Sequence, residues 1–116
     1  MFLNLNHKSP TAYTKIRELT KEIYKISNHF PAEERFNMVQ QIRRDALSVK
    51  LNFAEGSTRK SAQERKRYYE ISRGSTVEID AALETAVDLE YFKVESLQKA
   101  GVLLNECFSI LSKMIK

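Results

Sequence analysis

The chain has 116 residues, which is enough for one domain with one hydrophobic core and too few for a catalytic domain joined to a regulatory one. It contains only three glycines and two prolines, which excludes a β-sandwich or barrel, since such folds need a turn every ~8–12 residues. The formal net charge is +4, and the one cysteine excludes an intramolecular disulfide and any multi-cysteine metal site.

The first helix is predicted to follow a flexible N-terminal segment of residues 1–8. Ser9 is a typical N-cap residue, and Pro10 suits the first helical position. Pro31 is predicted to end the helix, because proline disfavours the helical conformation of the residue before it. Between these signals, apolar side chains recur at helical steps of three and four: Tyr13, Ile16, Leu19, Ile23, Ile26 and Phe30.

The second helix follows Glu33 and Glu34, which form either its acidic first turn or a short connector. Gly56 is predicted to close this helix as the residue after its C-cap, a position that usually requires a positive φ. Residues 57–60 are then the loop. The predicted buried stripe of this helix consists of Phe36, Val39, Ile42, Ala46, Val49 and Phe53.

The third helix is predicted from about residue 61 to 91, with Ser61 and Glu64 as a capping box. Gly74 lies inside it, where glycine costs about 1 kcal/mol relative to alanine. We therefore expect close approach of another helix backbone at Gly74, or a kink. The expected buried residues are Tyr68, Ile71, Ser75, Ile79, Ala82, Ala86 and Leu89, followed on a fourth helix by Leu97, Ala100, Leu104, Cys107, Leu111 and Met114.

Four helices joined by short loops predict an all-α fold for residues 9–116, an antiparallel up-down-up-down four-helix bundle. The apolar faces of the last two helices are wide for a monomer, which predicts a homo-oligomer. No apolar stretch is long enough to cross a membrane, and the first residues do not resemble a secretion signal, so we expect a cytoplasmic protein without membrane contact.

The residue types needed for catalysis are missing. Two histidines cannot supply a di-iron bundle site, and no glycine-rich loop is present to hold a phosphate. Cys107 lies on an apolar stripe and is predicted to be a buried structural thiol. The acidic residues Glu78, Asp80, Glu84 and Asp88 are interpreted as a solvated face. The sequence therefore predicts no enzyme, no catalytic residue, no metal and no cofactor.

Charge is segregated along the chain. The stretch 35–73 has ten basic and four acidic residues, a balance of +6, whereas the stretch 78–106 has two basic and seven acidic residues, a balance of −5. Lys and Arg neutralise phosphates, and a tyrosine between arginines can stack on an unpaired base. The candidate nucleic-acid-binding residues are Arg43, Arg44, Arg59, Lys60, Arg65, Lys66, Arg67, Tyr69 and Arg73. The alternative is that the tyrosines are core aromatics and the arginines are solvated or ion-paired.

Several motifs resemble those of one protein family. Asn52-Phe53-Ala54-Glu55-Gly56 is similar to its Asn-Ile-Ala-Glu-Gly signature, and Gln41-Ile42-Arg43-Arg44-Asp45-Ala46 to its Gln-Leu-Arg-Arg-Ala-Ala run. Gly74-Ser75 matches a Gly-Ser in the middle of its third helix. From about residue 12 onward, the chain resembles the bacterial four-helix-bundle proteins encoded in intervening sequences of 23S ribosomal RNA genes. The resemblance makes Asn52, Glu55, Gly56, Gly74 and Ser75 structural motif residues.

This resemblance implies a four-helix bundle that assembles as a homopentamer and has no known enzymatic activity. A related group, the accessory protein of diversity-generating retroelements, is a basic pentamer that binds nucleic acid and a reverse transcriptase. The expected partners are therefore other copies of the chain and RNA. The alternative is a protein–protein scaffold whose basic face docks an acidic partner or a polymerase such as a reverse transcriptase.

Overall fold

The computed structural model describes residues 1–5 and 9–116, and these residues form an all-α structure without strands. Residues 6–8, part of the expected flexible segment 1–8, lie outside the described residues. Two short 3₁₀ helices, η1 (Ala32–Glu34) and η2 (Val94–Leu97), lie in the connections. The four α-helices are α1 (Pro10–Ser27), α2 (Met38–Thr58), α3 (Ala62–Asp88) and α4 (Gln98–Ile115).

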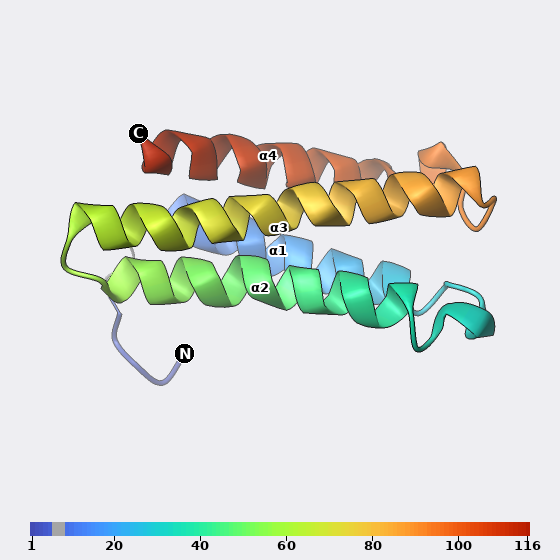
Figure 1. Ribbon diagram of the computed structural model, residues 1–116, viewed down its shortest axis with the longest axis horizontal. Coiled ribbons are helices and arrows are strands. Elements are labelled where there is room, and N and C mark those ends of the chain that lie inside the picture. Colours follow the sequence, from blue (N-terminus) through green and yellow to red (C-terminus); the bar gives the residue numbers. More distant parts are fainter. Residues whose placement is uncertain (6–8) are drawn as a thin grey trace.

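The four helices lie side by side along the longest axis of a molecule that measures 44 × 27 × 19 Å (Figure 1). Each helix packs against the next one in the chain, and α4 also packs against α1. This packing is consistent with the antiparallel up-down-up-down bundle that the sequence predicts. The α2–α3 connection lies at the same end of the molecule as the C terminus (Figure 1).

The start of α1 is confirmed, because Ser9 Oγ accepts the backbone N–H of Ala12 at 3.2 Å and Pro10 is the first helical residue. The predicted end at Pro31 is wrong by three residues, since the helix stops at Ser27. The hydroxyl of Ser27 donates to the Tyr24 carbonyl at 2.7 Å and so competes with the backbone for it. Phe30 leaves the helix and is buried as part of the core.

The bounds of α2 differ from the prediction at both ends. Ala32–Glu34 is a separate short connector, which confirms one of the two alternatives for Glu33 and Glu34, whereas Phe36 is 77% exposed rather than part of the buried stripe. Gly56 does not close the helix, because α2 continues to Thr58 and no described glycine has a positive φ. Glycine is required at position 56 for a different reason: a Cβ there would lie 2.9 Å from Tyr68 Cβ and 2.9 Å from Tyr69 Cε1. The loop therefore contains only residues 59–61.

The N-cap of α3 is confirmed by the bond from the Glu64 N–H to Ser61 Oγ at 3.0 Å. Its end comes three residues earlier than predicted, after Asp88, because Glu90 turns the chain with a φ of 64°. The Tyr91 N–H then donates to the Ala86 carbonyl at 2.9 Å, which satisfies the helix end. The expected close approach at Gly74 is not found within the chain, since an added Cβ would meet nothing within 4 Å.

The face that α3 turns toward α2 is more polar than predicted, although Ser75 is buried as expected. Ile71 is exposed, and Ser72 takes its place in the interior. Ser72 Oγ donates to the Val49 carbonyl at 2.7 Å, and Ser75 Oγ donates to Ser48 Oγ at 2.8 Å. Small hydroxyl side chains therefore fill part of the α2–α3 contact, which lets the two backbones approach closely.

On α4, Cys107 is part of the hydrophobic core, as the sequence predicts. Burial, which disfavours the charged thiolate, raises the pKa of this thiol to about 12. Within the described part of the chain, no helix combines the length and the hydropathy needed to cross a membrane.

Candidate functional site

The loop between α2 and α3 gathers five basic residues at one end of the molecule. We call this group the basic end, and it consists of Arg59, Lys60, Arg65, Lys66 and Arg67. The group forms because Ser61 starts α3 only three residues after the last residue of α2. The end of α2 and the start of α3 are thereby brought to the same end of the molecule (Figure 1).

Arg65 holds the loop in place. Its Nη1 donates to the carbonyl oxygens of both Arg59 and Lys60, at 3.0 and 2.6 Å. Carbonyls just beyond a helix end have no partner within the helix, so the half-buried guanidinium takes over that role. The Arg65 guanidinium is therefore partly engaged with backbone carbonyls of its own chain, and Arg65 is a positioning residue.

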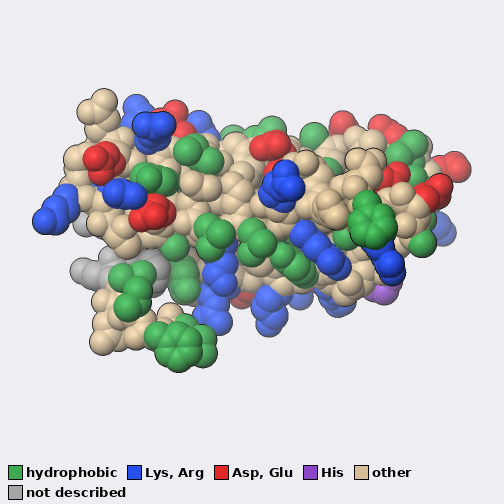
Figure 2. All heavy atoms as spheres, turned by 60° about the horizontal axis from the view of Figure 1, so that its bottom comes forward, with side chains coloured by type: hydrophobic (Ala, Val, Ile, Leu, Met, Phe, Trp, Pro, Cys, Tyr) green, Lys and Arg blue, Asp and Glu red, His purple; other side chains and the backbone are tan. Residues whose placement is uncertain are grey.

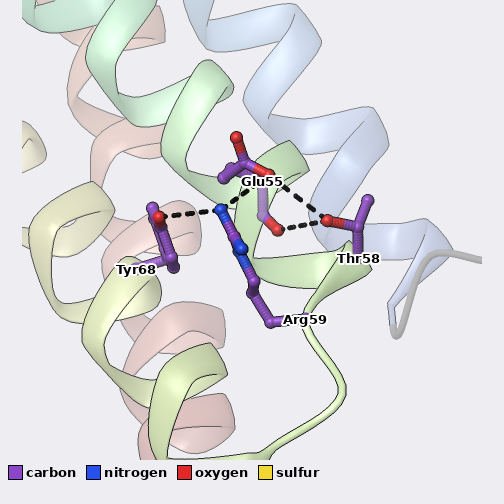
Figure 3. A network of polar contacts seen from close by, with 4 residues as sticks. All are labelled: Glu55, Thr58, Arg59 and Tyr68. Atoms are coloured by element: carbon purple, nitrogen blue, oxygen red, sulfur yellow. Dashed lines mark hydrogen bonds and ion pairs between the residues drawn. The ribbon is translucent and has the colours of Figure 1, made fainter.

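Arg59 is the centre of a polar network that Figure 3 shows from close by. Its Nη2 donates to the Tyr68 hydroxyl at 3.0 Å and forms an ion pair with Glu55 Oε2 at 3.3 Å. The guanidinium also lies over the Tyr68 ring, 5.0 Å from its centroid. Thr58 Oγ1 donates to Glu55 Oε2 at 3.3 Å, which holds the carboxylate. Glu55 and Tyr68 thus fix Arg59 against the bundle and offset its charge.

Tyr69 does not belong to the basic end, contrary to the prediction that it stacks on a base. It is 2% exposed, and its ring stacks on Phe53 at a centroid distance of 5.7 Å. Its hydroxyl lies 3.4 Å from Ser57 Oγ, within the α2–α3 contact. The alternative that the sequence left open, a core aromatic, describes Tyr69 correctly.

Three cations of the basic end remain free. Lys60, Lys66 and Arg67 are exposed, and none of them forms an ion pair with any residue that the structure describes. The carboxylates nearest in sequence are Glu55, which is engaged with Arg59, and the exposed Glu64 and Glu70, for which no ion pair is found among the described residues. The end therefore presents unneutralised positive charge to the solvent.

The other predicted basic residues lie elsewhere. Arg43 lies 16 positions before Arg59 on the chain, about 24 Å away along α2 at 1.5 Å per residue. Its Nε donates to Ser27 Oγ at 2.7 Å and its Nη2 to Asn28 Oδ1 at 2.9 Å, so it ties α2 to the end of α1.

Arg73 has a similar structural role between α3 and α4. Its Nη1 donates to Ser112 Oγ at 3.2 Å, and its guanidinium lies 5.5 Å from the centroid of the Phe108 ring. Arg44 is exposed on α2. The structure thus separates the nine predicted residues into one end group, a buried tyrosine and three arginines at other places.

The motif residues have local structural roles. Asn52 Nδ2 donates to the Ser48 carbonyl at 2.9 Å, one turn earlier on α2, and Ser75 bonds the same serine from α3. Glu55 holds Arg59, and Gly56 leaves room for the rings of α3. Gly74 alone has no contact that would explain a glycine within this chain.

A buried carboxyl group on α2 was missed by sequence reasoning. Asp45 is buried on α2; its Oδ1 accepts from Gln41 Nε2 at 3.1 Å, and its Oδ2 has no hydrogen-bond partner among the described residues. Burial raises the pKa of this carboxyl, and the nearby charge of Glu78 adds to the effect. A signal was available, because Asp45 lies three residues after Ile42 and four before Val49, on the predicted buried stripe.

The surface charge follows this arrangement. Figure 2 shows Lys and Arg side chains along the lower edge of the face it presents. Asp and Glu side chains lie at the right-hand end, where α3 finishes and α4 begins, and others lie among Lys and Arg side chains at the left-hand end. Within residues 1–5 and 9–116, no group of three His, Cys, Asp or Glu side chains could hold a metal ion. The free cations of the basic end thus have acidic side chains as neighbours, and acidic side chains also gather at the opposite end of the molecule.

Comparison with known protein families relates the chain to a described family. The family model described as 23S rRNA-intervening sequence protein matches residues 8–113, nearly the whole chain. No curated protein sequence matches the chain significantly.

Proposed function

Because the chain belongs to the 23S rRNA-intervening sequence protein family, we propose that it is a non-catalytic, oligomeric protein that binds RNA through the basic end. The observation that supports this proposal most is the set of three exposed, unpaired cations, Lys60, Lys66 and Arg67, beside a fixed loop. Arg59 and Arg65 position this loop through the contacts described above.

Affinity in this proposal comes from phosphate neutralisation. Each cation that meets a phosphate releases condensed counterions, which favours binding without selecting a base sequence. Tyr69 has no part in it, because its ring is buried. Arg43 and Arg73 contribute to the field of the molecule rather than to contacts, since both are engaged between helices.

Assembly is the second part of the proposal. In an antiparallel up-down-up-down bundle, the outer faces of α2, α3 and α4 leave large apolar side chains exposed, namely Leu47, Leu51, Ile71, Val77, Val102 and Phe108. A neighbouring copy packed on these faces would bury them, and Gly74 would offer it a close approach. We propose a homo-oligomer, and the family resemblance implies that it contains five subunits.

Assembly would multiply a weak contact. Five copies of a chain with a net charge of +4 would total about +20, and their basic ends would repeat around the assembly. An RNA strand that reaches several copies binds far more tightly than it would bind one.

The proposal is tested by fluorescence anisotropy with a labelled single-stranded RNA. For three phosphates per subunit, the affinity of one subunit should fall by about twentyfold between about 50 and 200 mM salt, and more if several subunits bind together. Lys66→Glu/Arg67→Glu should abolish binding at the higher salt concentration. Arg17→Glu/Lys21→Glu on α1, with the same change of charge, is the matched control and should bind much more like the parent.

Gel filtration with light scattering reports the assembly in the same samples. An intact oligomer with unchanged RNA affinity in the Lys66→Glu/Arg67→Glu variant would exclude the basic end as the binding site. A parent protein that fails to bind RNA even at low salt would contradict the RNA proposal and favour the scaffold hypothesis.

A further inference from the structure

A second site lies away from the basic end, beside the C-terminal part of α1. A cavity of about 480 Å³ opens there between α1 and the connection from α3 to α4, and its lining includes Glu22, Lys25, His29, Tyr91, Phe92 and Lys93. This volume lies within the range of roughly 300–1,000 Å³ that is typical of small-molecule sites. None of these residues belongs to the candidate RNA-binding set.

The cavity is lined by a buried carboxylate. Glu22 is only 8% exposed, and its one ion pair within the described residues is with Lys99 Nζ, at the long distance of 3.8 Å. Lys99 itself is largely exposed, so this pair is weak. Glu22 therefore keeps acceptor capacity for a ligand that offers N–H groups.

Aromatic side chains form another wall, and the fold holds them in place. The rings of Tyr91 and Phe92 pack edge-on against Phe30, at centroid distances of 6.2 and 4.9 Å. The Tyr91 hydroxyl donates to Glu34 Oε2 at 2.8 Å. Both residues follow the left-handed turn at Glu90, which directs the chain back toward α1. A wall fixed in this way loses little entropy when a flat ligand binds.

The rim of the cavity carries two lysines, Lys25 and Lys93, at an end of the molecule that is otherwise rich in acidic side chains. Lys25, His29 and Lys93 are exposed, and none of them forms an ion pair with a residue in the described ranges. A ligand that suits all three features has a planar aromatic part, adjacent N–H donors on one edge and an anionic group.

From this combination we infer that the cavity binds a guanine 5′-nucleotide. Guanine offers a ring N–H beside an exocyclic NH₂, which together match the two oxygens of a carboxylate once Glu22 Oε1 exchanges its long contact with Lys99 for the ligand. Adenine presents a ring acceptor beside its amino group, so a carboxylate repels that edge. The aromatic wall contacts the base, and Lys25 and Lys93 meet the phosphate. The nucleotide is either free or an unpaired guanosine of an RNA strand; only the second case rests on the proposed function.

Titrations of the whole protein with GMP, AMP and guanosine test the inference by calorimetry and by NMR chemical shifts. We expect GMP to bind at least tenfold more tightly than AMP, with shifts at His29, Tyr91 and Phe92. Glu22→Gln should reduce this preference to about threefold or less, because an amide offers only one acceptor. Lys25→Ala/Lys93→Ala should bring the affinity for GMP close to that for guanosine. Circular dichroism checks that each variant is folded.

The Lys66→Glu/Arg67→Glu variant is the matched control and should bind GMP like the parent. Equal affinities for GMP and AMP, or shifts confined to other residues, would overturn the inference even if RNA still binds at the basic end. A uridine oligomer with one guanosine, compared with the plain oligomer, separates the two sources. If the guanosine increases the affinity of the oligomer, and Glu22→Gln abolishes this increase, RNA is the source of the nucleotide. If GMP binds but the guanosine does not increase the affinity of the oligomer, the free nucleotide is the ligand.

Discussion

Gly56 of α2 lies so close to Tyr69 of α3 that a Cβ at Gly56 would stand 2.9 Å from Cε1 of the tyrosine ring. The ring cannot move away freely, because its other contacts are the stacked ring of Phe53 and the hydroxyl of Ser57. The distance between α2 and α3 at the basic end is therefore set by the absence of one side chain.

We predict that Gly56→Ala destabilises the protein. Overpacking of a filled contact costs typically 1–3 kcal/mol, and alanine returns up to about 1 kcal/mol through its higher helix propensity. The net loss should be about 1 kcal/mol, the middle of a range of about 0–2 kcal/mol, measured by urea denaturation. Gly101→Ala is the matched control, because an added Cβ there meets nothing within 4 Å. If both variants are equally stable, the close approach at Gly56 is not what makes glycine necessary.

A second prediction concerns the pH dependence that Asp45 causes. Its pKa is raised in the folded protein from the ordinary value of 3.8, mainly by burial, so the folded state holds the proton more tightly than the unfolded chain does. Stability is therefore lost as the pH rises from below 3.8 through the raised pKa. Asp45→Asn removes this titration while it retains a polar side chain of the same shape.

The measurement is the difference in unfolding free energy between the Asp45→Asn variant and the parent at several pH values from about 3 to 8. The other carboxylates titrate in both proteins, so their contributions largely cancel in the difference. We expect the unfolding free energy of the variant to increase relative to that of the parent as the pH rises. A difference that stays constant, or that favours the parent at neutral pH, would show that Asp45 is compensated in the folded state.

The left-handed turn after α3 gives a third prediction. Glu90 has a φ of 64°, a conformation that costs a residue with a Cβ about 1 kcal/mol and costs glycine very little. Glu90→Gly should therefore stabilise the protein by up to about 1 kcal/mol, seen as a higher melting temperature. Asp88→Gly, two residues earlier within α3, serves as the control and should lower it. A drop in both variants would contradict this account of the helix end.

The fourth prediction separates positioning from binding in the basic end. Arg65→Ala removes the donor to two loop carbonyls and should cost about 1 kcal/mol, a value reduced by the partial exposure of the guanidinium. Lys66→Ala should change stability by less than about 0.5 kcal/mol, because the side chain is exposed and unpaired. Thermal unfolding of the two variants distinguishes them. Equal stabilities would mean that Arg65 is as free for a ligand as Lys66.

The sequence predicts the parts of this fold that depend on local chemistry. Ser9 and Ser61 start helices because their hydroxyls cap backbone N–H groups, and such caps depend on a few neighbouring residues only. The number of helices and most of the buried apolar positions follow from the same short-range periodicity.

The errors come from contacts between helices. Apolar periodicity places Tyr68 and Ile71 inside. The structure instead buries the next residue in each case: Tyr69, which stacks on Phe53, and Ser72, which bonds to α2. The role of Gly56 depends on a ring 13 positions later in the chain, and the end of α3 depends on a glutamate where glycine would be the usual signal.

The candidate site shows the same division. The cluster at the α2–α3 loop follows from the short connection between the two helices. The local sequence does not reveal which of its cations already have partners within the protein. Arg59 is paired with Glu55, and Arg65 is bonded to backbone carbonyls, so only three of the five cations are free.

The buried Cys107 thiol can report how often the packed helices separate. Because the chain has one thiol, enclosed between packed helices and with a pKa of about 12, a thiol-alkylating reagent finds almost no reactive thiolate in the closed state. Modification must wait until α4 moves away from its neighbours, so its rate measures how often that helix detaches. No label or mutation is needed to follow this motion, and a ligand that bridges α1 and the α3–α4 connection would slow the reaction in proportion to its occupancy.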